Sequence, residues 1–188
     1  MNRRNHLTYN APVTLTFVFL CLGATLLGRM SGGAFTRKFF STYRMPLVDP
    51  LLYMRLLTHV LGHAGWEHFL GNATYLLLLG PMLEEKYGSE ILVHLIVRTA
   101  LVTGLFNNIL FPHVALCGAS GVVFAFIVLA SFTEFRAGEI PLTFVLVIVF
   151  YVGQQIVLGL LVQDNVSNLS HILGGLMGAV EGYRFNRR

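Results

Sequence analysis

Six apolar segments follow one another along this chain, and most of them approach the roughly 20 residues that a helix needs to cross a membrane. They span about 11–28, 67–86, 91–110, 119–134, 141–161 and 168–184. Pro81, Gly88, Pro112 and Pro141 stand near their boundaries, where helices commonly end or begin. This pattern predicts an all-α polytopic membrane protein, a single domain over 1–188 built as a bundle of six transmembrane helices.

The composition excludes several other classes of protein. Hydrophobic residues make up 55% of the chain and charged residues 12%, against about 25% charged in a soluble domain. The mean hydropathy is +0.67. We therefore expect membrane lipid to surround the chain. The net charge of +4 is spread along the sequence, so no nucleic-acid partner is expected. The two cysteines, Cys21 and Cys117, fall in or beside apolar segments and indicate no disulfide framework.

The N-terminus has the layout of a secretory signal, because Asn2-Arg3-Arg4 precedes an apolar run from 11 to 27. No small-x-small cleavage pattern follows this run, so we expect the first segment to be retained as a membrane helix. Lysines and arginines gather on the side of the two termini, and the loops at 111–117 and 162–167 carry none. The positive-inside rule therefore predicts that both termini are cytoplasmic.

The first loop, 29–66, is the exception to this charge distribution, since it holds five lysines and arginines among aromatic and aliphatic residues. Such a mixture is typical of a segment that lies in the membrane interface. A loop of this length in a compact protein is commonly functional. In the third apolar segment, Arg98 is expected either to extend toward the interface or to pair with a glutamate.

Two polar residues stand in segments that are otherwise built for lipid. Ser120 opens the fourth segment within Gly118-Ala-Ser-Gly121, and His171 lies in the last one. Polar groups in lipid are costly and usually functional, and a hydroxyl beside an imidazole suggests nucleophilic catalysis. The ordinary alternatives are that Ser120 caps a helix and that His171 bonds a neighbouring helix.

Glycines at four-residue spacing favour close approach of the last helix to the fourth. Gly174 and Gly178 would form the small face of the last helix, and Gly121 would begin the matching face of the fourth. If these faces meet, the hydroxyl of Ser120 and the ring of His171 come within hydrogen-bonding reach.

The second segment is preceded and opened by three histidines and an asparagine, namely His59, His63, His68 and Asn72. His68 and Asn72 are four residues apart and so share one helical face, and an asparagine amide is a suitable donor to an oxyanion. The histidines could instead bind a metal, but only Glu67 is near enough to complete a ligand set. We therefore expect no metal and no cofactor. Cys117 is an alternative nucleophile, disfavoured by its apolar neighbours.

Together these motifs resemble the rhomboid family of intramembrane serine proteases. The resemblance runs from about residue 53 to 182 in the family's order: a loop arginine, H-x-x-x-H, H-x-x-x-N, a glutamate before Gly-Ser, G-x-S-G, and H-x-x-G-x-x-x-G. It implies that Ser120 is the nucleophile and His171 its general base. It also implies roles for further residues: an oxyanion hole from Asn72, His68 and the Ser120 N–H, close backbone approach at Gly118, and structural support from Arg55, His59, His63 and Glu84.

The chain departs from the family's usual residues at three positions. Phe124 stands where a tyrosine commonly packs on the catalytic imidazole, so it can stack but cannot donate a hydrogen bond. Met54 stands where a tryptophan often precedes the loop arginine, and Ser170 where an alanine often precedes the histidine. None of these changes removes a group that the implied chemistry needs.

The resemblance implies an endopeptidase that cuts transmembrane protein substrates through a Ser-His dyad, in a bacterial plasma membrane. No acidic residue is placed to orient His171, because Asp164 falls in a loop and Glu181 near the end of the last helix. A rhomboid relative that binds membrane proteins for quality control without catalysis is the first alternative, although such proteins lack the serine or the histidine. A small transporter is the second, opposed by the absence of an internal repeat.

Overall fold

In the computed structural model, the described residues are 8–133, 139–154, 157 and 165–186, and most of them are helical. The helices run in the order α1 (Pro12–Met30), α2 (Ala34–Phe39), α3 (Pro50–Thr58), the 3₁₀ turn η1 (His59–Leu61), α4 (Trp66–Tyr87), α5 (Ser89–Leu110), α6 (Ser120–Ser131), α7 (Leu142–Val147), the π-helical turn η2 (Ile148–Val152) and α9 (Asn165–Asn186). Within the described residues the only extended pairing is an isolated bridge between Thr42 and Leu116.

Each predicted apolar segment coincides with a helix over all or part of its length. The fifth, expected at 141–161, begins with α7 and continues into η2, while most of its second half lies outside the described residues. Two helices in the described part, α1 and α5, are long and apolar enough to cross a membrane by length and composition, and α6 is a shorter apolar helix. The all-α class is thus observed, whereas the count of six spans stays a prediction.

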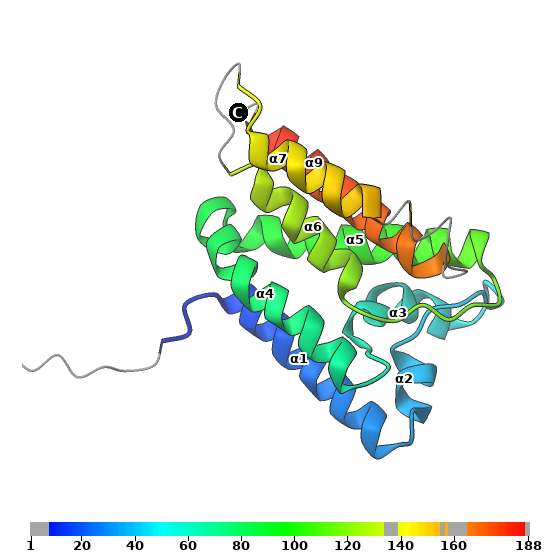
Figure 1. Cartoon of the computed structure of the whole chain (residues 1–188). Helices are drawn as coiled ribbons and strands as arrows, with labels where there is room; N and C mark the ends of the chain where they lie inside the picture. The colour runs from blue at the N-terminus through cyan, green and yellow to red at the C-terminus, as the bar shows by residue number, and fades with distance from the viewer. Residues whose placement is uncertain (1–7, 134–138, 155–156, 158–164, 187–188) are drawn as a thin grey trace, which may run out of the picture.

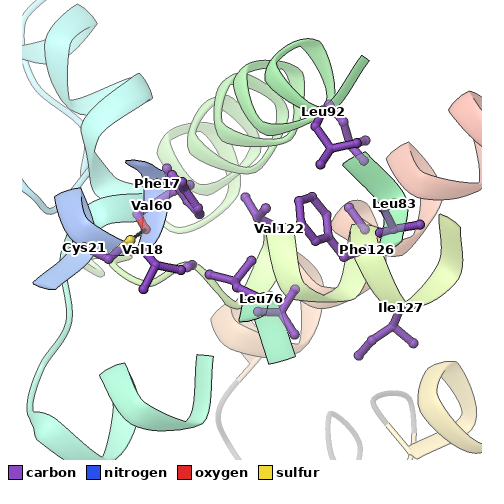
Figure 2. Packing of buried hydrophobic residues seen from close by; sticks show 14 of the residues in the cluster. Phe17, Val18, Cys21, Val60, Leu76, Leu83, Leu92, Val122, Phe126 and Ile127 are labelled. Atoms are coloured by element: carbon purple, nitrogen blue, oxygen red, sulfur yellow. Dashed lines mark hydrogen bonds between the residues drawn. The ribbon is translucent and has the colours of Figure 1, made fainter. Parts of the chain in front are cut away.

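Helix α6 lies in the middle of the bundle (Figure 1). It packs on α4 on one side and most extensively on α9 on the other, and α1 packs on α4. Helix α5 contacts α1, α4, α6 and α9 and so ties the row together. Figure 2 shows Val122 and Phe126 of α6 among Leu76 and Leu83 of α4 and Leu92 of α5. These five side chains are almost completely buried.

Glycines allow the close approach of α6 and α9. A Cβ added at Gly174 would overlap the carbonyl oxygen of Gly121, and one at Gly178 would overlap that of Ala125. Larger residues at these positions of α9 would therefore force the two backbones apart. This interface fixes where the start of α6 lies relative to the first half of α9.

Two buried charged residues hold the loops in place. The guanidinium of Arg55 donates from Nε to the Lys38 carbonyl at 2.7 Å and lies 4.6 Å from the ring centre of Tyr43. The carboxylate of Glu84 accepts hydrogen bonds from the backbone N–H groups of Val13 and Thr14, at 2.9 and 3.0 Å, and from the Ser89 hydroxyl at 2.7 Å. Glu84 therefore joins the end of α4 to the beginnings of α1 and α5.

Candidate active site at the start of helix α6

Ser120 is the first residue of α6, and Ala119 occupies the N-cap position. The helix start has no side-chain cap. The alternative interpretation of Ser120 as the helix cap is therefore wrong. The N–H groups in the first turn of a helix lack acceptors within that helix, and their partial positive charge favours an anion beside them.

The first loop holds the segment that leads into α6. The N–H of Gly118 donates to the His59 carbonyl at 3.0 Å, and Thr42 and Leu116 exchange two backbone hydrogen bonds of 2.9 Å. Gly118 has a φ of +133°, and a Cβ there would lie 2.7 Å from Cε1 of His68. Only glycine fits this position, because a side chain would combine backbone strain with a collision against the imidazole.

His63 bonds the backbone next to the serine through its ring. Its Nδ1 lies 3.1 Å from the Leu61 carbonyl, which can only accept, so Nδ1 carries the proton. Nε2 then accepts the hydrogen bond from the N–H of Ala119 at 3.5 Å. Burial, together with the nearby His68, lowers the pKa of His63 to about 4, so the ring is neutral at pH 7.

His59 is also buried and neutral. Its Nδ1 lies 3.1 Å from the Arg55 carbonyl, and its Nε2 lies 3.2 Å from the Thr103 hydroxyl. Burial lowers the pKa of His59 to about 4. The ring of His59 thus connects the first loop to α5, and its backbone carbonyl accepts the hydrogen bond from the Gly118 N–H.

His171 lies against the first turn of α6. Its imidazole stacks on the ring of Phe124, with ring centroids 4.3 Å apart and planes at 9°. Phe124 is one helical turn after Ser120. The backbone before His171 also lies close to α6, because a Cβ added at Gly121 would be 3.4 Å from the carbonyl oxygen of Ser170. The structure thus brings the helical turn that begins with Ser120 together with the part of α9 that carries His171.

Helix α4 contributes Asn72 and His68 to the same region. The side chain of Asn72 is 7% exposed, and its Nδ2 has no hydrogen-bond partner among the described residues. An unsatisfied buried donor costs about 1–3 kcal/mol, so it calls for an explanation. The ring of His68 borders Gly118 and meets the ring of His63 edge-on at 5.0 Å.

The structure describes two of the other residues considered from the sequence, the alternative nucleophile Cys117 and the acidic residue Glu181. Cys117 is half-buried, and burial raises the pKa of its thiol, which disfavours the thiolate needed for nucleophilic attack. Glu181 pairs with Arg98 on α5, so of the two alternatives expected for that arginine the structure shows pairing with a glutamate. Asp164 lies outside the described residues.

A polar stripe runs along α5, and its two threonines were not anticipated from the sequence. Thr99, Thr103 and Asn107 are spaced by four residues and are all buried. Thr103 contacts His59, and the Asn107 amide donates to the carbonyls of Thr42 and Val114 at 3.2 and 3.0 Å. Their regular spacing within an apolar helix was the signal that could have revealed them.

The family model described as Rhomboid domain matches residues 51–188, which is more than half of the chain. The chain belongs to the rhomboid family. The resemblance inferred from the motifs is thereby confirmed. Because rhomboids are integral membrane proteins, so is this chain.

Three curated relatives carry the name rhomboid protease. This rhomboid is 28% identical over 179 residues to rhomboid protease GluP of Bacillus subtilis, covering 90% of the chain and 34% of that relative. It is 24% identical over 183 residues to rhomboid protease GlpG of Haemophilus influenzae, covering 96% of the chain and 94% of the relative. It is 25% identical over 181 residues to rhomboid protease GlpG of Yersinia enterocolitica, covering 92% and 62%. The chain thus spans about a third of the length of the Bacillus relative.

Proposed function

We propose that this rhomboid is an intramembrane serine endopeptidase in which Ser120 is the nucleophile and His171 the general base. The observation that carries the proposal is the stacking of His171 on Phe124, one turn after Ser120 in α6. A parallel stack restricts the tilt of the imidazole, so the histidine needs no carboxylate to orient it. The names of the relatives support the same class of activity.

In the proposed reaction, the hydroxyl oxygen of Ser120 attacks a peptide carbonyl while a ring nitrogen of His171 takes its proton. The protonated imidazole then gives that proton to the leaving amine, which yields an acyl-enzyme. A water molecule then attacks the ester carbonyl while His171 takes its proton. His171 returns this proton to the departing Ser120 oxygen, which releases the carboxylic acid product and regenerates the serine. The dyad supplies every proton transfer in this sequence.

The negative oxygen that forms during attack needs hydrogen-bond donors. The unpartnered Nδ2 of Asn72 and the backbone N–H of Ser120 are the donors proposed for this oxyanion, with His68 beside them. A preformed donor that bonds only when charge develops stabilises the transition state more than the bound substrate. This assignment accounts for the Nδ2 of Asn72, which has no hydrogen-bond partner in the part of the chain that the structure describes.

The proposed substrates are membrane-spanning proteins. A substrate helix hides its carbonyls in hydrogen bonds, so it must unwind locally before Ser120 can attack, and glycine or proline near the cut lowers that cost. The further parts of this proposal are six spans, a single domain, cytoplasmic termini and a bacterial plasma membrane. They rest on the charge distribution and the family resemblance.

The test combines active-site labelling with cleavage of a single-span substrate by the purified protein in liposomes. Ser120→Ala and His171→Ala should each abolish cleavage, because the two groups act as a unit. Ser120→Ala should also abolish labelling by a fluorophosphonate, while Ser131→Ala, at the other end of the same helix, should leave labelling and cleavage unchanged. Cleavage by Ser120→Ala that disappears in Ser120→Ala/Cys117→Ser would overturn the assignment of the nucleophile.

A further inference from the structure

A charged cavity of about 560 Å³ lies between α5 and α9, at the end of the bundle far from Ser120. Helix α5 lines it with Glu90, His94 and Arg98, which are four residues apart and share one face. Helix α9 lines it with Glu181, Arg184 and Phe185. Because Glu181 is ten residues beyond His171 on α9, the cavity and the candidate active site are about 15 Å apart along that helix.

The buried carboxylate of Glu181 is paired with two arginines in this cavity, but both guanidinium groups keep further N–H donors. Glu181, whose side chain is 8% exposed, pairs with Arg98, and its Oε1 lies 3.7 Å from Nη1 of Arg184. The two arginine side chains are 43% and 63% exposed. A guanidinium has five N–H donors, so most of those on Arg98 and Arg184 remain available to a ligand.

Arg98 also lies well inside its helix. It is nine residues beyond Ser89, which places it about 13 Å from the start of α5. A charge at that depth of a membrane helix is costly unless it is paired or reaches a polar cavity, and such residues are usually functional. A second partner that brings negative charge into the cavity would stabilise Arg98 beyond its single ion pair.

The charge balance of the cavity favours a ligand that carries both a positive and a negative group. Arg98 and Arg184 provide two positive charges, and Glu90 and Glu181 provide two negative ones, so the cavity has no net charge to attract a strongly anionic ligand. A group with one phosphate and one ammonium matches this arrangement, since guanidinium groups bind phosphate through paired hydrogen bonds and carboxylates bind ammonium. Glu90 is exposed and makes no ion pair among the described residues.

We propose that this cavity is a binding site for the phosphoethanolamine headgroup of a membrane phospholipid. Arg98 and Arg184 hold the phosphodiester, and Glu90 holds the primary ammonium. The position of Arg98 inside a membrane helix favours the lipid over a water-soluble phosphodiester with the same chemistry, because acyl chains hold a lipid beside that helix.

The experiment measures lipid retention by native mass spectrometry and the thermal shift on adding lipid, using the full chain in detergent. The protein carries Ser120→Ala, so binding is read without catalysis and the result does not depend on the proposed protease activity. Phosphatidylethanolamine should bind at least about tenfold more tightly than phosphatidylcholine, whose methylated ammonium cannot donate hydrogen bonds to Glu90. Glycerophosphoethanolamine, which lacks acyl chains, should produce no shift.

Two variants and two matched controls locate the site. Arg184→Gln and Glu90→Gln should each weaken phosphatidylethanolamine binding by about tenfold or more, because each removes a charged hydrogen bond. Neither variant breaks the pair between Arg98 and Glu181, so both should fold. Arg29→Gln and Glu85→Gln, at exposed positions outside the cavity, should bind as the parent does. If the variants and the controls bind phosphatidylethanolamine equally well, the location of the site is wrong. If glycerophosphoethanolamine binds as tightly as phosphatidylethanolamine, the ligand is not specifically a lipid.

Discussion

The imidazole of His171 lies parallel to the ring of Phe124, at a centroid distance of 4.3 Å and an interplanar angle of 9°. The two residues belong to α9 and α6, which meet along a face of glycines and alanine. The stack therefore depends on helix packing and not on a local turn. It places the imidazole beside the helix that Ser120 begins.

Replacing Phe124 tests whether stacking orients the base. Phe124→Ala should lower kcat by about 2- to 10-fold, the equivalent of about 0.5–1.5 kcal/mol for a lost aromatic contact. Phe124→Tyr keeps the ring and should retain the parent rate. Steady-state cleavage of a single-span substrate provides the measurement, with Phe106→Ala on the exposed face of α5 as the control. An unchanged kcat for Phe124→Ala would show that something else orients His171.

Asn72→Ala should reduce kcat by about 10²–10³ and leave KM nearly unchanged, because the amide would bond the oxygen only when it becomes negative. Thr74→Ala is the matched control, since Thr74 is exposed on the same helix and bonds only the Leu70 carbonyl. Thermal stability of Asn72→Ala should not fall, because its Nδ2 has no hydrogen-bond partner among the described residues. A variant with full kcat would mean that other donors form the oxyanion hole, with His68 the next to replace.

Close packing of α6 and α9 predicts that alanine is not tolerated at two glycines. Gly174→Ala and Gly178→Ala should each destabilise the fold by about 1–3 kcal/mol or more, because each Cβ would overlap a backbone carbonyl of α6. Gly71→Ala on α4 meets no atom within 4 Å and should be neutral or slightly stabilising. The unfolding midpoint of each purified variant in detergent measures the difference. Equal midpoints for all three would contradict the helix interface.

Acid should destabilise the protein through His59 and His63. Each imidazole takes up a proton near pH 6.5 when unfolded but only near pH 4 when folded, because both are buried. Their contribution to stability is therefore complete above about pH 6.5 and is lost as the pH falls from 6.5 toward 4. The loss is of the order of 2 kcal/mol for each group at pH 5.

Melting temperatures between pH 4 and 8 measure this acid sensitivity. His63→Gln should flatten the curve, whereas His113→Gln, at an exposed loop position, should leave its shape unchanged. A parent protein that melts at the same temperature at pH 5 and pH 7.5 would contradict the neutral, buried state of the two rings.

The predicted orientation can be tested with single-cysteine probes in a chain lacking Cys21 and Cys117. A probe in the first loop must be accessible to the reagent. Val48 is 92% exposed and suits this purpose, whereas Ser41 in the same loop is only 4% exposed and would react poorly. Val48→Cys and His113→Cys should react with an impermeant reagent from outside intact cells, and Glu85→Cys should not. Labelling of Glu85→Cys from outside would invert the topology and place the bond cut near the cytoplasmic leaflet.

The positions of the helices were readable from the sequence because apolar length and turn residues are local properties. The boundaries of α1, α4, α5, α6 and α9 lie within a few residues of the predicted segments. The motif around Ser120 was also readable from the sequence, because its glycine reflects a local property. Gly118 has a positive φ, a backbone conformation that favours glycine. The π-helical turn η2 within the fifth segment had no counterpart in the hydrophobic pattern.

The partners of each polar group could not be read from the sequence, because they come from residues far apart in the chain. Glu84 was expected to organise the turn after α4, yet it also holds the first turn of α1, about 70 residues earlier. His63 supports Ala119 from 56 residues away. The orphaned amide of Asn72 became visible only after every neighbouring acceptor had a position.

Sequence alone thus indicated which residues are candidates for the chemistry, because a serine, a histidine and an asparagine in apolar membrane segments are costly and usually functional. Tertiary structure decided which of them meet and in what state. The stack of His171 on Phe124, the neutral ring of His63 and the shared carboxylate of Glu181 all depend on how closely α4, α5, α6 and α9 pack. Distances and burial set by that packing, and not residue identity, determine protonation and hydrogen bonding.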